Sequence, residues 1–268
     1  MIESSRLTAK RIGEYLTHGK RFDGRKLDEM REITIETGIS KKSEGSAKVK
    51  FGKTEVWVGV KMSVGEPYPD SLDKGNLMVT AELTPLSSPK FEYGPPKFET
   101  IELGRLVDRG IRESKIIDLS KLCIVEGKKV WNVFIDVYSI NDDGNLLDAS
   151  FIGALAALKS AKIPHYDEKE NKINYEKESK KNLPLNEELP LNFNVYKIGE
   201  SLFLDPTTEE EVASEGRLTI GVIPGSPIKI CSMQKSESME ITPEKFAEML
   251  ELVEKKHKTY FTEVVKKI

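Results

Sequence analysis

Several stretches of the chain alternate apolar and polar residues, which is the pattern of strands that bury one face. Residues 33–37 alternate in this way, and the runs 46–51 and 54–62 follow, joined by a tight connection at residues 52–53. Residues 63–76 contain two glycines and two prolines and are predicted to form a loop. Further strands are predicted at 77–83 and 130–140, as a pair within 193–204, and at 217–222 and 227–233.

Other stretches space their apolar residues three or four positions apart, as in helices with one buried side. Helices are predicted at 4–18, at 98–114, at the alanine-rich run 146–161 and after a capping Thr242. The buried side of the 98–114 helix is expected to comprise Ile101, Leu103, Leu106, Val107 and Ile111. The segment 165–191 is dominated by Lys and Glu and is predicted to be a mobile loop or an exposed hairpin.

The order of these elements is strands, helix, strand, helix, strands and a final helix. This order predicts an α/β (α+β) fold in which mixed or antiparallel sheets pack against helices. A parallel dinucleotide-binding sheet is the competing fold, but the chain has no Gly-x-Gly-x-x-Gly run to support it.

The composition limits the classes of function. Of 268 residues, 32% are charged and the net charge is −3, so contact with a polyanion must come from a local basic patch rather than an overall basic field. Cys123 and Cys231 are expected to be buried, reduced thiols, and the three histidines, His18, His165 and His257, to lie on the surface without a metal. No apolar run is long enough to cross a membrane, and no signal-peptide core follows Met1, which predicts a cytoplasmic protein.

One helix carries a candidate binding surface. Arg105, Arg109 and Arg112 are spaced four and three residues apart within 98–114, so they share one face. Such a face can bind phosphates, or its arginines can form ordinary surface salt bridges with nearby acidic residues. The spacing alone favours the salt bridges, whose partners would be Glu102, Asp108, Glu113 or Asp118.

Several short strings match a known pattern: the turn 21–25, the hairpin residues 44–47 and 52–56, the arginine-rich helix 101–112 and the small-residue helix from Ala149. Together these strings resemble the ribonuclease PH superfamily. Each string is weak alone, but they occur together in the order typical of that family and cover nearly the whole chain. The resemblance implies a single ribonuclease PH-like domain over 1–268, with halves at about 20–190 and 191–268.

Four other strings point to a subfamily: residues 65–70, 73–76, 82–86 and 94–96. These strings resemble the non-catalytic ring subunit of archaeal exosomes. The resemblance implies a hexameric ring, a trimer of heterodimers, in which this subunit alternates with a catalytic paralogue beneath caps that carry S1 or KH domains. It further implies that the complex degrades RNA from the 3′ end with inorganic phosphate, that phosphate and Mg²⁺ bind at the paralogue's site, and that this chain holds no cofactor of its own.

The resemblance also places the expected phosphate site. Active members carry Gly-Gly-Thr-Arg just before the small-residue helix, where the hydroxyl, the guanidinium and the helix N-terminus bind phosphate. This chain has residues 144–147 there, and Leu146 and Leu147 replace the Thr and the Arg. Three nearby aspartates, Asp142, Asp143 and Asp148, are expected to repel an anion. We therefore expect no catalytic residue in this chain.

A second catalytic element of active members is a pair of aspartates six residues apart. Asp205 and Glu211 hold these positions here, and the more favoured interpretation is a solvated acidic turn rather than a metal site. Three hypotheses remain. The first is a non-catalytic subunit that positions RNA through Arg105 and Arg109, and less through Arg112. The alternatives are an exoribonuclease active in its own right and a purely structural ring component.

Overall fold

The computed structural model describes residues 6–168, 170–175 and 181–268. Its helices are α1 (Arg6–Thr17), α2 (Phe98–Ser114), the 3-10 turn η1 (Leu119–Leu122), α3 (Leu146–Ser160), α4 (Thr208–Ala213) and α5 (Pro243–Lys267). Its strands are β1 (Ile33–Thr37), β2 (Gly45–Phe51), β3 (Thr54–Gly65), β4 (Asn76–Leu83), β5 (Cys123–Val125), β6 (Lys129–Asn141), β7 (His165–Asp167), β8 (Lys172–Asn174), β9 (Leu191–Ile198), β10 (Ser201–Phe203), β11 (Gly216–Ile223) and β12 (Lys229–Lys235).

The larger sheet has the strand order β1-β2-β3-β6-β4, with β5 added along β6. All its pairs are antiparallel except β4 with β6, which is parallel. The hairpin between β2 and β3 turns at Gly52, whose φ of +59° is a conformation that glycine adopts without strain. The smaller sheet, β10-β9-β11-β12, is antiparallel throughout. The predicted α/β fold with mixed and antiparallel sheets is confirmed.

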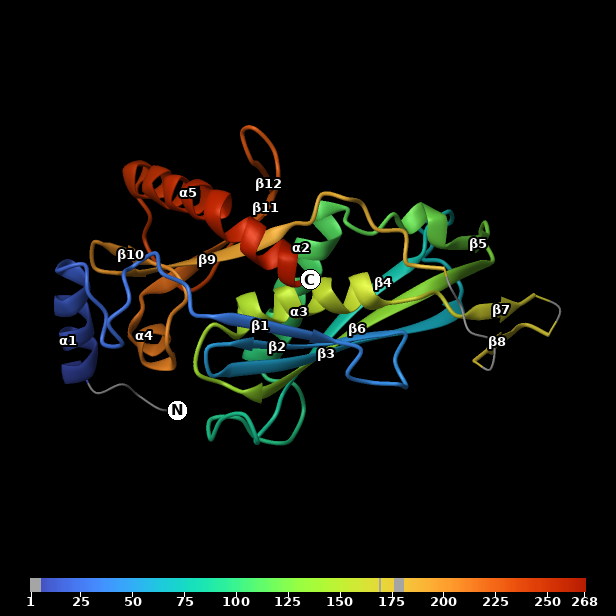
Figure 1. The fold of residues 1–268 in the computed structure, drawn as a ribbon, viewed down its shortest axis with the longest axis horizontal. Coiled ribbons are helices and arrows are strands. Elements are labelled where there is room, and N and C mark those ends of the chain that lie inside the picture. Colours follow the sequence, from blue (N-terminus) through green and yellow to red (C-terminus); the bar gives the residue numbers. More distant parts are fainter. Residues whose placement is uncertain (1–5, 169, 176–180) are drawn as a thin grey trace.

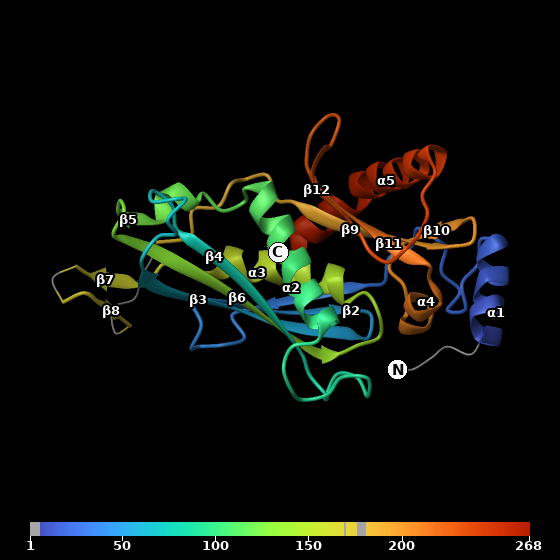
Figure 2. The same cartoon turned by 180° about the vertical axis from the view of Figure 1, so that it is seen from behind.

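The helices α2 and α3 lie between the two sheets, and α5 lies on the other side of the smaller sheet, where it reaches β1 (Figures 1 and 2). Small residues let α3 approach the larger sheet closely. A Cβ atom on Gly153 would lie 2.7 Å from Cγ2 of Val58, so only glycine fits there without a shift. This close packing fixes the position of α3 on the sheet, and the resemblance places the phosphate site at the N-terminal end of this helix.

The predicted elements match the structure with local differences. The helix 98–114 has its predicted bounds, but Ile101 was wrongly placed on its buried side and is 59% exposed. The reason is helical geometry, because Ile101 points the same way as Arg105 one turn later. Strand β3 continues to Gly65, three residues into the predicted loop. Residues 4 and 5 of the first predicted helix lie outside the described residues.

Two predictions from composition were wrong. His257 is buried rather than exposed, because α5 packs its ring between Phe193 and Phe261, at centroid distances of 6.3 and 4.9 Å. Both cysteines are free thiols as predicted, but they are half-buried.

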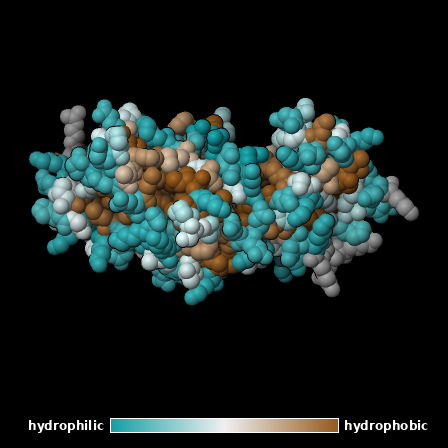
Figure 3. All heavy atoms as spheres, turned by 90° about the horizontal axis from the view of Figure 1, so that it is seen from above, coloured by the Kyte–Doolittle hydropathy of each residue, from teal (hydrophilic) through white to brown (hydrophobic). Residues whose placement is uncertain are grey.

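The charged segment 165–191 forms a hairpin, β7 with β8, as one of its two interpretations predicted. Residues 169 and 176–180 of this segment lie outside the described residues. Its end is anchored, since Leu183 and Leu189 are buried in the main core. In the described part of the chain, no helix is both long and apolar enough to span a membrane. Seen from above, hydrophobic side chains emerge between hydrophilic ones on the face that carries α5 (Figure 3).

Candidate RNA-contacting face and the closed phosphate position

The exposed side of α2 carries the three predicted arginines. Leu103, Leu106, Val107 and Ile111 point into the core, which leaves the opposite side of the helix in solvent. Arg105, Arg109 and Arg112 all lie on this exposed side, as their spacing predicted. We call this surface, formed by Arg105, Arg109 and Arg112, the arginine face.

The three arginines differ in how firmly they are held. Arg112 donates from Nε and Nη2 to the two carboxylate oxygens of Asp108, at 3.0 and 2.7 Å, and from Nη2 to the Leu77 carbonyl at 2.9 Å. The hydrogen bond to Asp108 raises the pKa of Arg112. Arg109 has only a 3.7 Å contact with Glu113, and Arg105 has no hydrogen-bond or ion-pair partner within the described ranges. Arg105 and Arg109 are therefore available to an anion at little cost, whereas Arg112 must first leave Asp108.

The phosphate position expected from the resemblance lies at the start of α3. Leu146 and Leu147 begin this helix and line an open pocket of about 820 Å³. Six glutamates also line it, against three cations; the charged lining residues are Glu92, Glu99, Glu102, Glu211, Glu215, Glu237, Lys90, Lys97 and Arg217. The cations are already neutralised, because Lys90 pairs with Asp142 at 2.7 Å, Lys97 with Glu92 at 2.8 Å and Arg217 with Glu102 at 3.0 Å.

A carboxylate of the chain itself occupies the N-terminal end of α3. Glu211 accepts the backbone N–H of Asn145 at 2.8 Å and the hydroxyl of Tyr196 at 3.0 Å. Burial raises the pKa of Glu211. The donors at a helix N-terminus are a common anion site, and here an internal anion takes one of them. At this end of α3 one backbone donor is therefore already taken, and Leu146 and Leu147 offer no side-chain ligand to a phosphate.

The second expected catalytic position, Asp205, is saturated with donors. Its Oδ2 accepts from Arg25 at 2.6 Å and from the backbone N–H of Arg31 at 2.7 Å. Its Oδ1 accepts from Arg31 at 2.7 Å and from Asn145 at 2.9 Å. The side chain is fully buried, so the sequence-based picture of a solvated acidic turn was wrong for Asp205.

The buried network continues into α3 and the smaller sheet. Asp148 accepts from Asn145 at 2.9 Å and from Asn194 at 2.6 Å, and Asn194 accepts from Thr219 at 2.5 Å. Burial raises the pKa of Asp148 to about 7. Within the described residues, no group of three or more His, Cys, Asp or Glu side chains is arranged to hold a metal ion.

Two of the three aspartates that were expected to repel an anion pair with cations. Asp142 pairs with Lys90 and Asp143 contacts Arg31 at 3.3 Å, whereas Asp148 accepts only from amides. Repulsion of an anion by these carboxylates stays a prediction. The packing is tight as well, because a Cβ on Gly144 would lie 2.5 Å from the Pro206 carbonyl oxygen.

Sequence reasoning missed Arg31 and Asn194, which complete this network. Arg31 lies just before β1 in a polar stretch, and Asn194 is a fully buried amide in β9, which is otherwise mostly apolar. An amide in a buried strand needs partners, and this was the one available signal for Asn194. Arg21 is also buried, and it ties the 21–25 turn to a distant part of the chain by donating from Nε to Glu210 at 2.9 Å.

Residues 29–164 match domain 1 of the 3′ exoribonuclease family, and residues 189–256 match domain 2. The chain belongs to the 3′ exoribonuclease family. Within this family it is similar to the exosome complex component Rrp42 of Methanocella arvoryzae, with 48% identity over 89% of this chain and 88% of that protein. The Thermococcus kodakarensis Rrp42 is 44% identical over 96% of this chain and 94% of the relative.

Solved structures of family members agree in fold. A chain of the Archaeoglobus fulgidus exosome with RNA bound to the active site superposes with a TM-score of 0.85 at 41% identity, covering 95% of this chain and 98% of that one. A chain of an archaeal exosome core gives 0.78 at 40% identity, covering 92% and 91%. The resemblance to archaeal exosome subunits is therefore confirmed. The roles of Arg105, Arg109 and Arg112 stay predictions.

Proposed function

We propose that this chain is a ring subunit of an archaeal-type exosome that contacts RNA and leaves phosphorolysis to a catalytic paralogue. Its similarity to Rrp42 exosome components over most of both chains supports the place in the complex. The RNA-bound exosome among its structural neighbours supports RNA as the ligand of the assembly.

The observation that carries the non-catalytic role is the occupied end of α3. Phosphorolysis requires a phosphate held in line with the scissile bond, with its charge balanced by donors and cations. Here Glu211 takes the Asn145 N–H, and Leu146 and Leu147 stand where ligands would be needed. Phosphate and Mg²⁺ then belong to the paralogue's site, and this chain requires no cofactor.

The arginine face supplies the RNA contact. Guanidinium groups bind backbone phosphates without reading the bases, so they position a strand for a neighbouring active site. Arg105 and Arg109 lead, and Arg112 contributes after release from Asp108. The proposal includes a cytoplasmic ring of three heterodimers, in which this chain alternates with the paralogue, with S1- or KH-type subunits as caps.

Two alternatives make different predictions. An exoribonuclease active in its own right would degrade RNA without the paralogue. A purely structural ring component would assemble with the paralogue, but changes to the arginine face would leave RNA binding unaltered.

The test is phosphate-dependent decay of an oligo(A) RNA with Mg²⁺ present. The chain is assayed alone and with its catalytic paralogue, and the mass of each assembly is checked. We expect no decay by the chain alone, and faster decay by the mixture than by the paralogue alone. Decay by the pure chain would overturn the non-catalytic role.

A double variant separates RNA positioning from scaffolding. Arg105→Ala with Arg109→Ala is compared in the assembled ring with Lys41→Ala and Lys255→Ala, which remove two exposed positive charges elsewhere. We expect at least a tenfold loss of RNA affinity for the arginine pair and little change for the lysine pair. Equal affinities would favour the purely structural component.

A further inference from the structure

An exposed aromatic pair lies where α1 ends and the chain turns toward β1. Tyr15 is 43% exposed and Phe22 46%, and their rings pack edge to face with centroids 4.9 Å apart. The backbone N–H groups of His18 and Lys20 both donate to the Tyr15 carbonyl, at 3.0 and 3.1 Å, and this closes the turn. The turn therefore holds the two rings together, while each keeps much of its surface in solvent.

The packing of α1 decides which of its sides faces solvent. Ile12 and Leu16 are 2% exposed and belong to a small apolar cluster with side chains of β9 and β10. Arg11, Tyr15 and His18 are spaced four and three residues apart, so they form one stripe along the helix, and all three are exposed. The helix thus buries one side against the smaller sheet and presents this stripe to solvent.

The exposed cations of this region have no carboxylate partner among the residues that the structure describes. These cations are Lys10, Arg11, Lys20 and Lys26. Residues 7–26 contain only two acidic side chains, and one of them, Asp23, already pairs with Arg25 at 2.7 Å. Since the whole chain has a net charge of −3, the end of α1 is a local basic surface, which contact with a polyanion requires.

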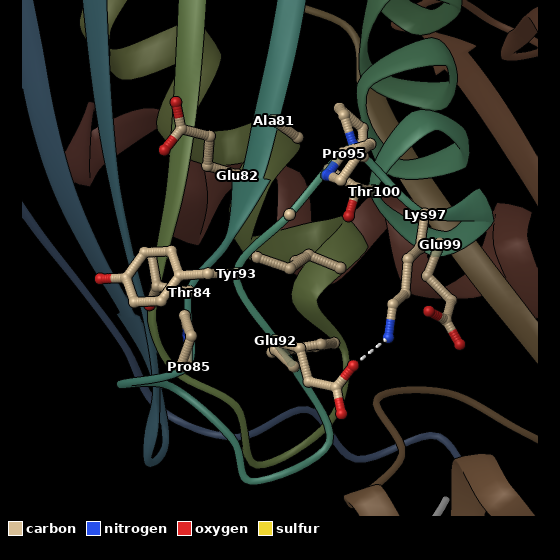
Figure 4. Close-up of a pocket in the computed structure, with 14 residues that line it drawn as sticks. Ala81, Glu82, Thr84, Pro85, Glu92, Tyr93, Pro95, Lys97, Glu99 and Thr100 are labelled. Atoms are coloured by element: carbon tan, nitrogen blue, oxygen red, sulfur yellow. Dashed lines mark hydrogen bonds and ion pairs between the residues drawn. The ribbon is translucent and has the colours of Figure 1, made fainter.

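Another exposed aromatic residue has the opposite surroundings. Tyr93 is 94% exposed and lines a pocket of about 310 Å³ together with Glu82, Glu92 and Glu99 (Figure 4). The one cation of that lining, Lys97, pairs with Glu92 at 2.8 Å. Phosphates are repelled there, whereas the end of α1 combines aromatic rings with unpaired cations. Proteins bind single-stranded nucleic acid with this combination, since bases stack on the rings and phosphates bind the cations.

We propose that the C-terminal end of α1 and the turn after it form a second binding surface for single-stranded RNA, separate from the arginine face. We call this surface the α1 patch, and its residues are Arg11, Tyr15, His18, Lys20 and Phe22. A base stacks on the aromatic pair, and the two cations bind neighbouring phosphates. This inference rests on the proposed function, since it gives the same RNA a second point of attachment.

The location of the α1 patch makes binding depend on the length of the RNA. Helix α1 lies at one end of the molecule, beside α4 and β10, whereas α2 lies near the middle (Figures 1 and 2). A short strand can therefore occupy only one of the two surfaces. A longer strand that is held by the arginine face reaches the α1 patch as an intramolecular contact, which raises its affinity.

The first test measures the affinity of the assembled ring for oligo(A) RNA of about 6 and about 30 nucleotides. Arg11→Ala with Tyr15→Ala is compared with Lys41→Ala and Tyr175→Ala, which remove one exposed cation and one exposed ring elsewhere. We expect the α1 variant to bind the long RNA at least fivefold more weakly, and the control to change its affinity less than twofold. Equal affinities of the two variants for the long RNA would overturn the second surface.

Substitutions of the ring separate stacking from charge. Tyr15→Phe keeps an aromatic face, whereas Tyr15→Leu removes it without changing the charge. We expect the Phe variant to bind the long RNA within twofold of the unaltered ring, and the Leu variant to bind several-fold more weakly at every salt concentration. Arg11→Ala should instead lower the slope of log affinity against log salt concentration by about 1. Equal binding by the Phe and Leu variants would exclude base stacking.

Crosslinking locates the contact directly. The assembled ring is irradiated with an oligo(U) RNA that carries 4-thiouridine, digested with trypsin and analysed by mass spectrometry. Trypsin cuts after Lys and Arg, so Tyr15 lies in the peptide 12–20 and Phe22 in the peptide 22–25. We expect RNA adducts on at least one of these two peptides. Adducts confined to other peptides would contradict the α1 patch.

The outcomes separate this inference from the proposed function. If the assembled ring binds no RNA, both fail. If Arg105→Ala with Arg109→Ala weakens RNA binding and the α1 variant does not, the α1 patch alone is wrong. If the α1 variant no longer assembles with the paralogue, this surface docks a protein subunit and the RNA occupant is overturned. Thermal unfolding of each variant confirms that the fold is unchanged.

Discussion

Two sets of three arginines in this molecule differ in burial and in how far along the sequence their carboxylate partners lie. Arg21, Arg25 and Arg31 are nearly buried, with side-chain exposures of 0%, 11% and 10%, and each binds a carboxylate distant in sequence. Arg109 and Arg112 of the arginine face are 54% and 42% exposed, and their partners are one helical turn away. The first set holds the fold around Asp205 and Glu210. The second set retains charge that a ligand can use.

The difference shows which arginines of this fold can exchange their partner for a ligand. A buried arginine that satisfies a buried carboxylate cannot be withdrawn without leaving that carboxylate unpaired. An exposed arginine with a local partner loses little on exchange, since surface pairs contribute about 0–1 kcal/mol. The position where the resemblance places a phosphate site is filled by contacts within the chain, whereas the neighbouring helix α2 carries exposed positive charge.

The largest expected effect follows from removing a buried arginine. Arg31→Ala leaves Asp205 with fewer donors and should lower the free energy of unfolding by about 3–5 kcal/mol. Urea denaturation measures this loss, with Arg105→Ala as the matched control that should change stability by less than about 0.5 kcal/mol. Equal losses in the two variants would break the distinction between the two arginine sets.

A pH effect follows from Asp148, whose pKa burial raises from 3.8 to about 7. The folded chain retains a proton that the unfolded chain has already lost, so stability falls as the pH rises between these two values. The full effect of this group is about 4 kcal/mol. Urea denaturation at several pH values should show the fall, and Asp148→Asn should flatten it. An unchanged slope in the variant would assign the effect to another group.

A smaller effect is expected for one arginine of the exposed set. In the assembled ring, Arg105→Ala should weaken RNA binding several-fold and lower the slope of log affinity against log salt concentration by about 1. The measurement is fluorescence anisotropy at several salt concentrations. Lys255→Ala serves as the control for the loss of one charge. An unchanged slope would remove Arg105 from the RNA contact.

The smallest effect concerns the arginine with the firmest local partner. Asp108→Asn frees Arg112 and should strengthen RNA binding about twofold to threefold. Glu113→Gln changes the same charge beside Arg109, where the contact is only 3.7 Å, and should have the smaller effect. Combining Asp108→Asn with Arg112→Ala should abolish the gain. A gain that persists would come from the lost negative charge rather than from Arg112.

Local pattern was sufficient for most elements. The bounds of α2 were predicted correctly, and Trp131, Val133, Ile135 and Val137 are all buried along β6, as strict alternation requires. Ile101 was misplaced because an apolar residue was assumed to be buried. His257 was misplaced because its polar neighbours hid the contact of α5 with Phe193, which lies far away in sequence.

The candidate site likewise has features that the local sequence predicts and features that it does not. The spacing of Arg105, Arg109 and Arg112 placed them on one exposed face, because helix geometry alone fixes that relation. The replacement of phosphate ligands by Leu146 and Leu147 was visible in the order of residues. The exposure of Tyr93 and Phe98 was not predicted, because the sequence alone does not show whether an apolar residue is buried or exposed.

The sequence by itself determined the family, the succession of strands and helices, and the leucines at the expected phosphate position. These features depend on near neighbours in the chain or on the order of short strings. Only the tertiary structure decided that Glu211 would cap the end of α3 and that Arg31 would hold Asp205. These contacts join residues 66 and 174 positions apart, and no local periodicity encodes which distant carboxylate will meet which donor.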